Sequence, residues 1–242
     1  MILGPIVDSA AVILGGVGGA FFAKRIPERL RTALPMTFGL ASMGLGIEFI
    51  FQVKQIPAMV LAIILGSLIG ELVYLEKGIT AVGNGARTLI ERLIPHHESH
   101  TALSSEDFSK QFVAILILFS ASGTGIFGAL TNGMTGDPTI LLAKSILDLF
   151  TAAIFATALG YTVALIFIPQ FAIQMGLALC AVFLLPLTTP VMMADFSACG
   201  GLIMLATGFR ICGIKTFPIA NFLPALVLVM PISYLWTTYA PG

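Results

Sequence analysis

Long hydrophobic runs separated by short polar turns dominate the chain. A helix that crosses about 30 Å of hydrocarbon needs roughly 20 mostly apolar residues. Eight runs meet this requirement, at about 3–23, 34–51, 57–76, 108–130, 138–160, 166–187, 197–213 and 218–237. The pattern therefore predicts an all-α polytopic membrane bundle of about eight helices. The stretch from Pro138 to Pro190 is almost uninterrupted, and only Gly160, Pro169 and Pro186 divide it into two spans.

The first hydrophobic run has a competing interpretation as a signal peptide. A cleaved signal carries its cations before the apolar core. Here Met1 is followed directly by apolar residues, and the cations follow the run, at Lys24, Arg25, Arg29 and Arg31. We therefore keep 3–23 as the first span.

Cations concentrate in three of the connections between spans. They are Lys24, Arg25, Arg29 and Arg31, then Lys77, Arg87, Arg92 and Lys110, then Arg210 and Lys215. With eight spans these connections share one side, which the positive-inside rule makes cytoplasmic. Lys54 is the one exception. Both termini are then expected on the periplasmic, outer side.

Composition agrees with a membrane protein and narrows its partners. The 242 residues are 57% hydrophobic and only 10% charged, with mean hydropathy +1.01, whereas soluble domains are about 25% charged. Twelve Lys and Arg balance twelve Asp and Glu, which argues against nucleic acid because phosphate binding needs a basic face. Three cysteines in apolar runs exclude a disulfide framework. We expect membrane lipids and a small ion or solute as partners, and no cofactor.

One hydrophilic insert, 78–107, interrupts what is otherwise a single membrane domain, 1–242. Its first part, residues 85–94, has the pattern of an amphipathic helix lying on the membrane surface. The sequence PHHESH follows and holds all three histidines of the chain. Zinc would need two ligands at helical spacing plus partners elsewhere, so we expect a solvated loop and no metal site.

Two segments resemble each other. Residues 38–70 and 199–232 both run from a Gly-rich helix through a turn with one lysine to a proline, which is Pro57 or Pro218. The predicted topology puts these turns on opposite sides, so spans one to three and six to eight would form an inverted repeat. The alternative is that membrane hairpins simply look alike.

Charged residues inside a span are the best guide to function, because each costs about 2.5–3.5 kcal/mol at the bilayer centre. Lys144 and Asp148 are spaced i, i+4 in the fifth span, which Asp137 and Pro138 begin. Asp148 lies roughly 15 Å deep, near the midplane. The two side chains either face a cavity and bind a substrate or ion, or form a self-neutralised structural pair.

Other polar residues are candidates for the same site. Five glycines between Ser122 and Asp137 favour irregular backbone of the kind that binds ions in broken helices. Prolines in LPLTTPVMMADF predict a second irregular element that carries Thr189 and Asp195. Arg210 either contributes to the site or snorkels to the cytoplasmic interface. Asn221 either caps a helix, pairs with a neighbouring residue or lines a substrate route.

Enzyme signatures are weak. The sequence SASG at 120–123 is a near miss for a rhomboid protease motif, yet no span contains a histidine to act as base. GMTGD at 133–137 has one residue too many for an intramembrane aspartyl protease, and neither HExxH nor a P-loop occurs. We therefore expect no catalytic residue and no enzyme.

Seven segments, which together span most of the chain, have sequences specific to one protein family. The segments are MILGPIVDSAAVILGGVGGAFF, FGLASMGLGIEF, PAMVLAIILGSLIGE, LFSASGTGIFGA, GMTGDPTILLAKSILDLFTA, LPLTTPVMMADFSACGG and ATGFRICGIKTFP. They resemble the YqgA/YdfK group of bacterial inner-membrane proteins, a family of unknown function. The resemblance implies an integral protein of the bacterial cytoplasmic membrane, and it supplies no substrate.

The residues then favour a small-solute or ion transporter or channel with a polar site at the midplane. In this hypothesis Asp148 and Asp195 bind the ion or proton, and Lys144 sets the charge state of Asp148. The alternative is a non-transporting scaffold or accessory subunit whose buried pairs fix helix register. Gly-rich helix faces also suit a homo-oligomer.

Overall fold

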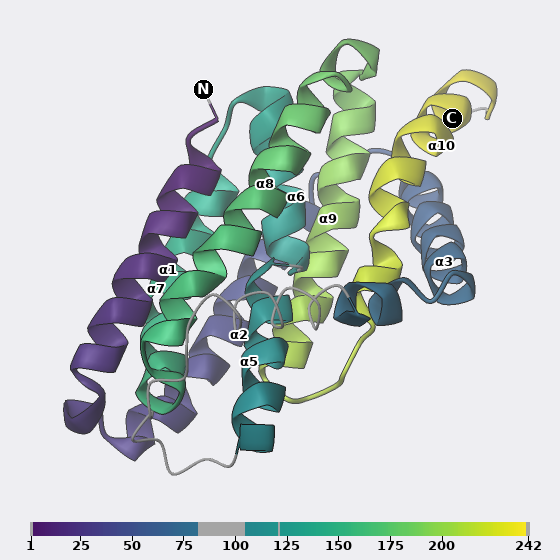
Figure 1. Cartoon of the computed structure of the whole chain (residues 1–242). Coiled ribbons are helices and arrows are strands. Elements are labelled where there is room, and N and C mark those ends of the chain that lie inside the picture. The colour runs from purple at the N-terminus through teal and green to yellow at the C-terminus, as the bar shows by residue number, and fades with distance from the viewer. Residues whose placement is uncertain (1, 82–104, 121, 241–242) are drawn as a thin grey trace. The chain divides into compact units, whose positions relative to one another are not determined.

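The computed structural model of the chain describes residues 2–81, 105–120 and 122–240, and these residues form helices joined by short turns. The helices are α1 (Gly4–Phe21), α2 (Glu28–Ile50), α3 (Ile56–Leu72), α5 (Ser105–Ser120), α6 (Gly123–Thr135), α7 (Thr139–Leu159), α8 (Phe167–Val182), α9 (Pro190–Ile211) and α10 (Pro224–Tyr239). Figure 1 shows their course. No strand occurs among the described residues, so the all-α fold predicted from the hydrophobic pattern is confirmed.

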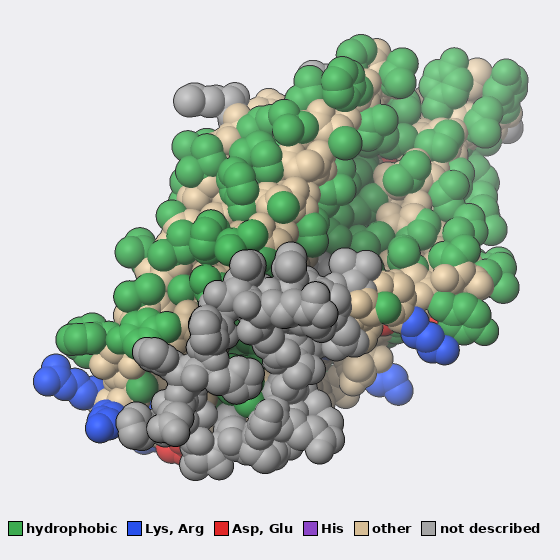
Figure 2. Space-filling view, in the orientation of Figure 1, with side chains coloured by type: hydrophobic (Ala, Val, Ile, Leu, Met, Phe, Trp, Pro, Cys, Tyr) green, Lys and Arg blue, Asp and Glu red, His purple; other side chains and the backbone are tan. Residues whose placement is uncertain are grey.

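Six stretches of the described chain are long and apolar enough to cross a membrane. A seventh is counted if α3 and helical residues 75–81, which meet at a bend of 53°, are taken as one broken span. Hydrophobic side chains cover the flanks visible in Figure 2, and the visible Lys and Arg side chains lie near helix ends. This is the distribution expected for helices that face lipid.

Gly160 divides the longest apolar stretch. Residues 139–182 pass the length test as one segment, but Gly160 has a φ of 66°, which only glycine adopts readily. The 3₁₀ turn η2 (Gly160–Ile166) follows it, so α7 and α8 are separate helices. The division expected from Gly160 is therefore present.

Two regions expected to be irregular are largely regular. The Gly-rich residues 123–135 form α6, and the break lies just before it, between α5 and α6. Glycine is tolerated in this helix because it permits close packing: a Cβ at Gly133 would collide with the backbone of Ala178. The run LPLTTP contains a 3₁₀ turn, η3 (Leu185–Leu187), after which Thr189 caps α9.

Contacts group the helices into two compact units. Residues 1–35 and 78–181 form the first unit, and residues 36–77 and 182–242 form the second. The chain passes from one unit to the other within α2, whose residues from Met36 onward belong to the second unit. The two units are therefore interleaved along the chain.

In the first unit α1 and α7 run parallel and in close contact. A Cβ at Gly15 would collide with the carbonyl oxygen of Leu149, and one at Gly19 would collide with that of Ala153. Small residues therefore allow the two backbones to meet. An apolar core built around Val12 and Phe119 packs against them.

In the second unit the two helical hairpins pack antiparallel. Gly46 of α2 faces Gly201 of α9, where a Cβ on Gly46 would lie 2.6 Å from the Gly201 oxygen. Gly70 of α3 lies against Asn221, just before α10. Antiparallel pairing of corresponding helices is the arrangement that the predicted inverted repeat of 38–70 and 199–232 requires.

The predicted amphipathic helix at 85–94 and the histidine-containing sequence at 95–100 lie outside the described residues.

Candidate functional site

Two helices of the first unit, α1 and α7, bring three charged residues together. Asp8 comes from α1, and Lys144 and Asp148 come from α7 (Figure 1). The Nζ atom of Lys144 donates to Oδ2 of Asp8 at 3.0 Å and also to Oδ2 of Asp148. All three residues are buried. The pairing predicted for Lys144 and Asp148 is therefore one half of a three-residue cluster.

Two glutamines of α8 extend this cluster. Gln170 and Gln174 are spaced i, i+4, so both side chains face the same neighbour. Their Nε2 atoms donate to Oδ2 of Asp8 at 2.7 and 2.6 Å. Gln170 also donates to Oδ2 of Asp148 at 3.1 Å. Oδ2 of Asp8 thus accepts three hydrogen bonds.

Several oxygens of the cluster have no such partner. Oδ1 of Asp8 and the Oε1 atoms of Gln170 and Gln174 are buried and accept no hydrogen bond from any described residue. A buried polar atom without a partner costs free energy, so such atoms call for an explanation. With two carboxylates and one ammonium, the formal charge of the ionised cluster is −1.

The break between α5 and α6 lies beside these residues. Ser122 is the N-cap of α6, and its hydroxyl accepts from the backbone N–H of Gly125 at 3.1 Å. A Cβ at Gly125 would lie 3.0 Å from Cε of Lys144 and 3.3 Å from Nε2 of Gln174. The Nζ atom of Lys144 is also 5.9 Å from the ring centroid of Phe119, near the end of α5. A broken helix therefore borders the charged cluster, as in transporter sites at helix interruptions.

Asp195 occupies a different place, in the second unit. Its Oδ1 accepts from the backbone N–H groups of Lys54 and Gln55, each at 2.8 Å, where α3 begins. Its Oδ2 accepts from the hydroxyl of Ser233 at 2.6 Å. Both carboxylate oxygens are therefore engaged in holding the turn before α3 and the side of α10.

The second unit has a further polar group at the opposite ends of the same helices. Arg210 donates to Oε1 of Glu76 at 2.6 Å, and Oε2 of Glu76 accepts from the N–H of Ala220 at 2.9 Å. Asn221 accepts from the N–H of Glu76 at 2.8 Å and donates to Glu71. These contacts tie the end of α3 to the turn before α10. Arg210 is thus half-buried in an ion pair.

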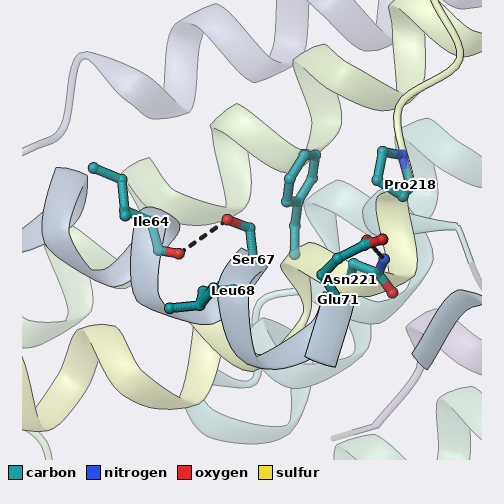
Figure 3. Close-up of a pocket in the computed structure, with 7 residues that line it drawn as sticks. Ile64, Ser67, Leu68, Glu71, Pro218 and Asn221 are labelled. Carbon is teal, nitrogen blue, oxygen red and sulfur yellow. Dashed lines mark hydrogen bonds between the residues drawn. The ribbon is translucent and has the colours of Figure 1, made fainter. Parts of the chain in front are cut away.

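A hollow of about 460 Å³ lies next to that group (Figure 3). Its lining residues are Ile64, Ser67, Leu68, Glu71, Pro218, Asn221 and Phe222. The walls are mostly apolar, the hydroxyl of Ser67 donates to the carbonyl of Ile64, and Asn221 bonds Glu71. The hollow therefore offers few polar groups to a ligand.

Asp137 and Thr189 both serve as helix-start residues. Oδ1 of Asp137 accepts from the N–H of Thr139 at 2.9 Å and from its hydroxyl at 2.6 Å. These two hydrogen bonds hold the pKa of Asp137 below its ordinary value of 3.8, against a small opposing effect of burial. The Thr189 hydroxyl accepts from the N–H of Met192 at 3.3 Å.

Comparison with known proteins agrees with the membrane fold. The family described as "Protein of unknown function (DUF554)" matches residues 3–234. The chain belongs to this family. It is 54% identical over 241 residues to "Uncharacterized protein YqgA" of Escherichia coli (strain K12), with 99% of both chains covered. It is 24% identical over 229 residues to "Uncharacterized membrane protein YdfK" of Bacillus subtilis (strain 168), with 93% of both covered. No solved structure matches it.

The resemblance inferred from sequence is confirmed by these matches, and the protein is a multi-pass membrane protein of the DUF554 family. Of the residues predicted for the site, the structure brings Lys144, Asp148 and Ser122 into one neighbourhood. Asp195, Arg210 and Asn221 belong to the second unit, and Thr189 caps α9. Asp137 was expected to cap the helix that begins at Pro138, but the N-cap of α7 is Pro138, and Asp137 lies one residue before it and bonds Thr139. These are their positions in the fold.

Asp8, Gln170 and Gln174 were not placed in the site by the sequence analysis. Asp8 is the only charged residue of α1, and Gln170 and Gln174 are the two amides of an otherwise apolar α8. Their i, i+4 spacing in a hydrophobic span was a usable signal, because amides in hydrocarbon need partners. No pattern in sequence, however, linked positions 8, 144 and 170.

Proposed function

We propose that this DUF554 protein is a transporter or channel that moves an ion or small solute through the first unit. The observation that carries the proposal is the buried cluster of Asp8, Lys144 and Asp148, with unpartnered oxygens beside a broken helix. Ionised groups inside a membrane are costly, and they are retained mainly where they line a substrate or ion pathway. The proposal assigns no catalytic step to any residue.

The arrangement also suits controlled access. A cluster whose lysine bonds two carboxylates has alternative pairings, so a change in its charge can shift the helices that carry them. α1, α7 and α8 each contribute to the cluster, and Ser122, whose backbone is extended, begins α6 beside it. Coupling an ion to movement of helices is the basis of alternating access.

The test is flux into liposomes that contain purified protein. Current and pH change are followed under gradients of Na⁺, K⁺ and H⁺, for wild type and for Asp148→Asn. We expect flux through wild type and its loss in Asp148→Asn, while Asp195→Asn, a buried carboxylate variant in the other unit, retains flux. Unchanged flux in well-folded Asp148→Asn would remove the cluster from the pathway.

The same purified protein distinguishes the transporter role from the scaffold role, which the sequence analysis gave as the alternative. A scaffold would give no flux from folded wild type under any gradient, and it would be captured with partner membrane proteins. The contacts of Lys144 with Asp8 and Asp148 fix helix register in either case, so stability alone does not discriminate between the two roles.

We further propose that the protein lies in the bacterial cytoplasmic membrane with both termini on the periplasmic side. The cation distribution supports this orientation, because Lys77 and Lys215 follow the ends of α3 and α9, Arg210 lies in the last turn of α9, and Lys24 and Arg25 follow α1. A reporter fused after residue 242 tests it: alkaline phosphatase activity is expected, and fluorescence of a cytoplasm-only reporter would contradict it.

A further inference from the structure

We infer that the cluster of Asp8, Asp148, Gln170 and Gln174 binds one monovalent alkali cation beside the ammonium of Lys144. The inference rests on the proposed function for its physiological role, and it names the class of ion that the site takes. It concerns binding, which is measured without transport.

The charge of the cluster calls for one more positive charge. Asp8, Lys144 and Asp148 are the only Asp, Glu, Lys or Arg residues in α1, α6, α7, η2 and α8. The described part of α5 that reaches the cluster presents Phe119, an uncharged ring. With both aspartates ionised, the formal charge of −1 is uncompensated by these elements, and a monovalent cation neutralises it, whereas a divalent ion would leave an excess positive charge. Net charge buried in a low dielectric is expensive, so this neutralisation favours binding.

The free oxygens provide the ligands. Gln170 is 0% exposed and Gln174 is 1% exposed, and each places Nε2 on Asp8. Each Oε1 is two bonds from such a nitrogen, and Oδ1 of Asp8 is two bonds from the Oδ2 that accepts those hydrogen bonds. Three buried oxygens without a described donor thus lie close to Oδ2 of Asp8. Carboxylate and amide oxygens are the ligands that hard cations prefer.

Lys144 leaves these ligands free. Its Nζ bonds Oδ2, and not Oδ1, of each aspartate. The Phe119 ring, with its centroid 5.9 Å from Nζ, offers the ammonium a second favourable contact if a cation pushes it away. Lysine and cation would then share the two carboxylates and repel each other.

The experiment measures binding of ²²Na⁺ to purified protein in detergent. Wild type is expected to bind Na⁺ saturably at one site per chain, with displacement by unlabelled NaCl and none by choline chloride. No saturable binding by monodisperse, folded wild type would overturn the inference.

Single-residue variants test which side chains bind Na⁺. Asp8→Asn and Gln174→Leu each remove charge or an oxygen ligand, so the dissociation constant for Na⁺ should rise about tenfold or more, a factor that corresponds to 1.4 kcal/mol. Gln174→Glu retains oxygen ligands and should keep binding. Asp195→Asn is the matched control, because both oxygens of that buried carboxylate already accept hydrogen bonds. Equal affinity in wild type, Asp8→Asn and Gln174→Leu would overturn the inference.

Lys144→Met should change the affinity for Na⁺ in the opposite direction. Removing the ammonium removes its repulsion, so Na⁺ should bind about tenfold more tightly. A purely structural lysine predicts lower affinity or none, through disruption of the cluster. Thermal unfolding with and without Na⁺ is measured alongside, because bound cation should raise the transition temperature in wild type and not in Asp8→Asn.

Binding and flux separate the two proposals. Specific Na⁺ binding without flux would keep the cation site and contradict the transporter role. Flux that requires Asp148 in a protein that binds no Na⁺ would keep the transporter role and overturn the cation site.

Discussion

Asp8 and Lys144 lie 136 positions apart in the chain, and Oδ2 of the first accepts a hydrogen bond from Nζ of the second at 3.0 Å. This contact joins α1 to α7 and places two carboxylates on one ammonium, because Asp148 bonds the same Nζ. The lysine therefore cannot be removed, or either aspartate neutralised, without changing the pairing of the other two.

Replacing only one or two of the three charged residues of the cluster should destabilise the protein. Removing one member of a buried ion pair costs about 3–5 kcal/mol, since it leaves an uncompensated charge. We expect Lys144→Met to lower the free energy of unfolding by that order. The double variant Lys144→Met with Asp148→Leu should remain destabilised, because it still leaves Asp8 buried and unpaired.

The matched triple variant combines Asp8→Asn with Lys144→Met and Asp148→Leu, and so replaces all three charged residues. It should recover most of the lost stability, because neutral replacements of buried ionic groups are often tolerated. Unfolding by denaturant in detergent measures all three proteins. If the double variant were as stable as wild type, Asp8 would not depend on Lys144.

Packing of α1 on α7 provides a prediction with a neighbouring control. A Cβ at Gly19 would collide with the backbone of Ala153, whereas a Cβ at Gly18 meets nothing within 4 Å. Gly19→Ala should therefore force the helices apart and destabilise the unit by about 1–3 kcal/mol. Gly18→Ala should be neutral or stabilising by about 0.5–1 kcal/mol, because alanine favours helix.

Thermal unfolding of the two alanine variants checks this difference. Equal transition temperatures would show that α1 does not pack on α7 at Gly19.

Asp195 should matter for the structure of the second unit. Its carboxylate accepts from two backbone N–H groups at the start of α3 and from Ser233. Asp195→Ala would leave the buried hydroxyl of Ser233 without its partner, at a cost of about 1–3 kcal/mol, and the part-buried N–H groups of Lys54 and Gln55 would lose their acceptor at a smaller cost. Asp195→Asn keeps an acceptor for the turn and should lose less. Hydrogen exchange at Lys54 and Gln55 reports the effect, and equal protection in Asp195→Ala and wild type would contradict it.

Asp137 should give a small, pH-dependent contribution to stability. Its folded pKa lies below 3.8, so the contribution is fully present above the unfolded pKa and is lost as pH falls through the folded value. Asp137→Ala should cost about 1 kcal/mol at neutral pH, as loss of a helix-start acceptor does.

The stability difference between Asp137→Ala and wild type should then narrow at acid pH. Parallel unfolding curves from neutral pH to below 3.8 measure it. A difference that stayed constant over this range would mean that the charge on Asp137 does not contribute.

Sequence by itself determined the class of structure. Hydrophobic runs long enough to cross a membrane must satisfy their backbone hydrogen bonds internally, and helices do so locally, residue by residue. The i, i+4 pair of Lys144 and Asp148 was readable for the same reason, since helical geometry fixes which side chains of one helix meet. The break at Gly160 followed from the backbone freedom of glycine.

Only the tertiary structure decided which helices share a site. Asp8, Gln170 and Gln174 join Lys144 through contacts between helices far apart in sequence, and the apolar periodicity of a buried span does not encode its neighbours. The same limit applies to Asp195: its charge was visible in sequence, but its use as an acceptor for α3 depends on how α9 packs. Local physics sets the helices, whereas the close approaches permitted by small residues select their partners.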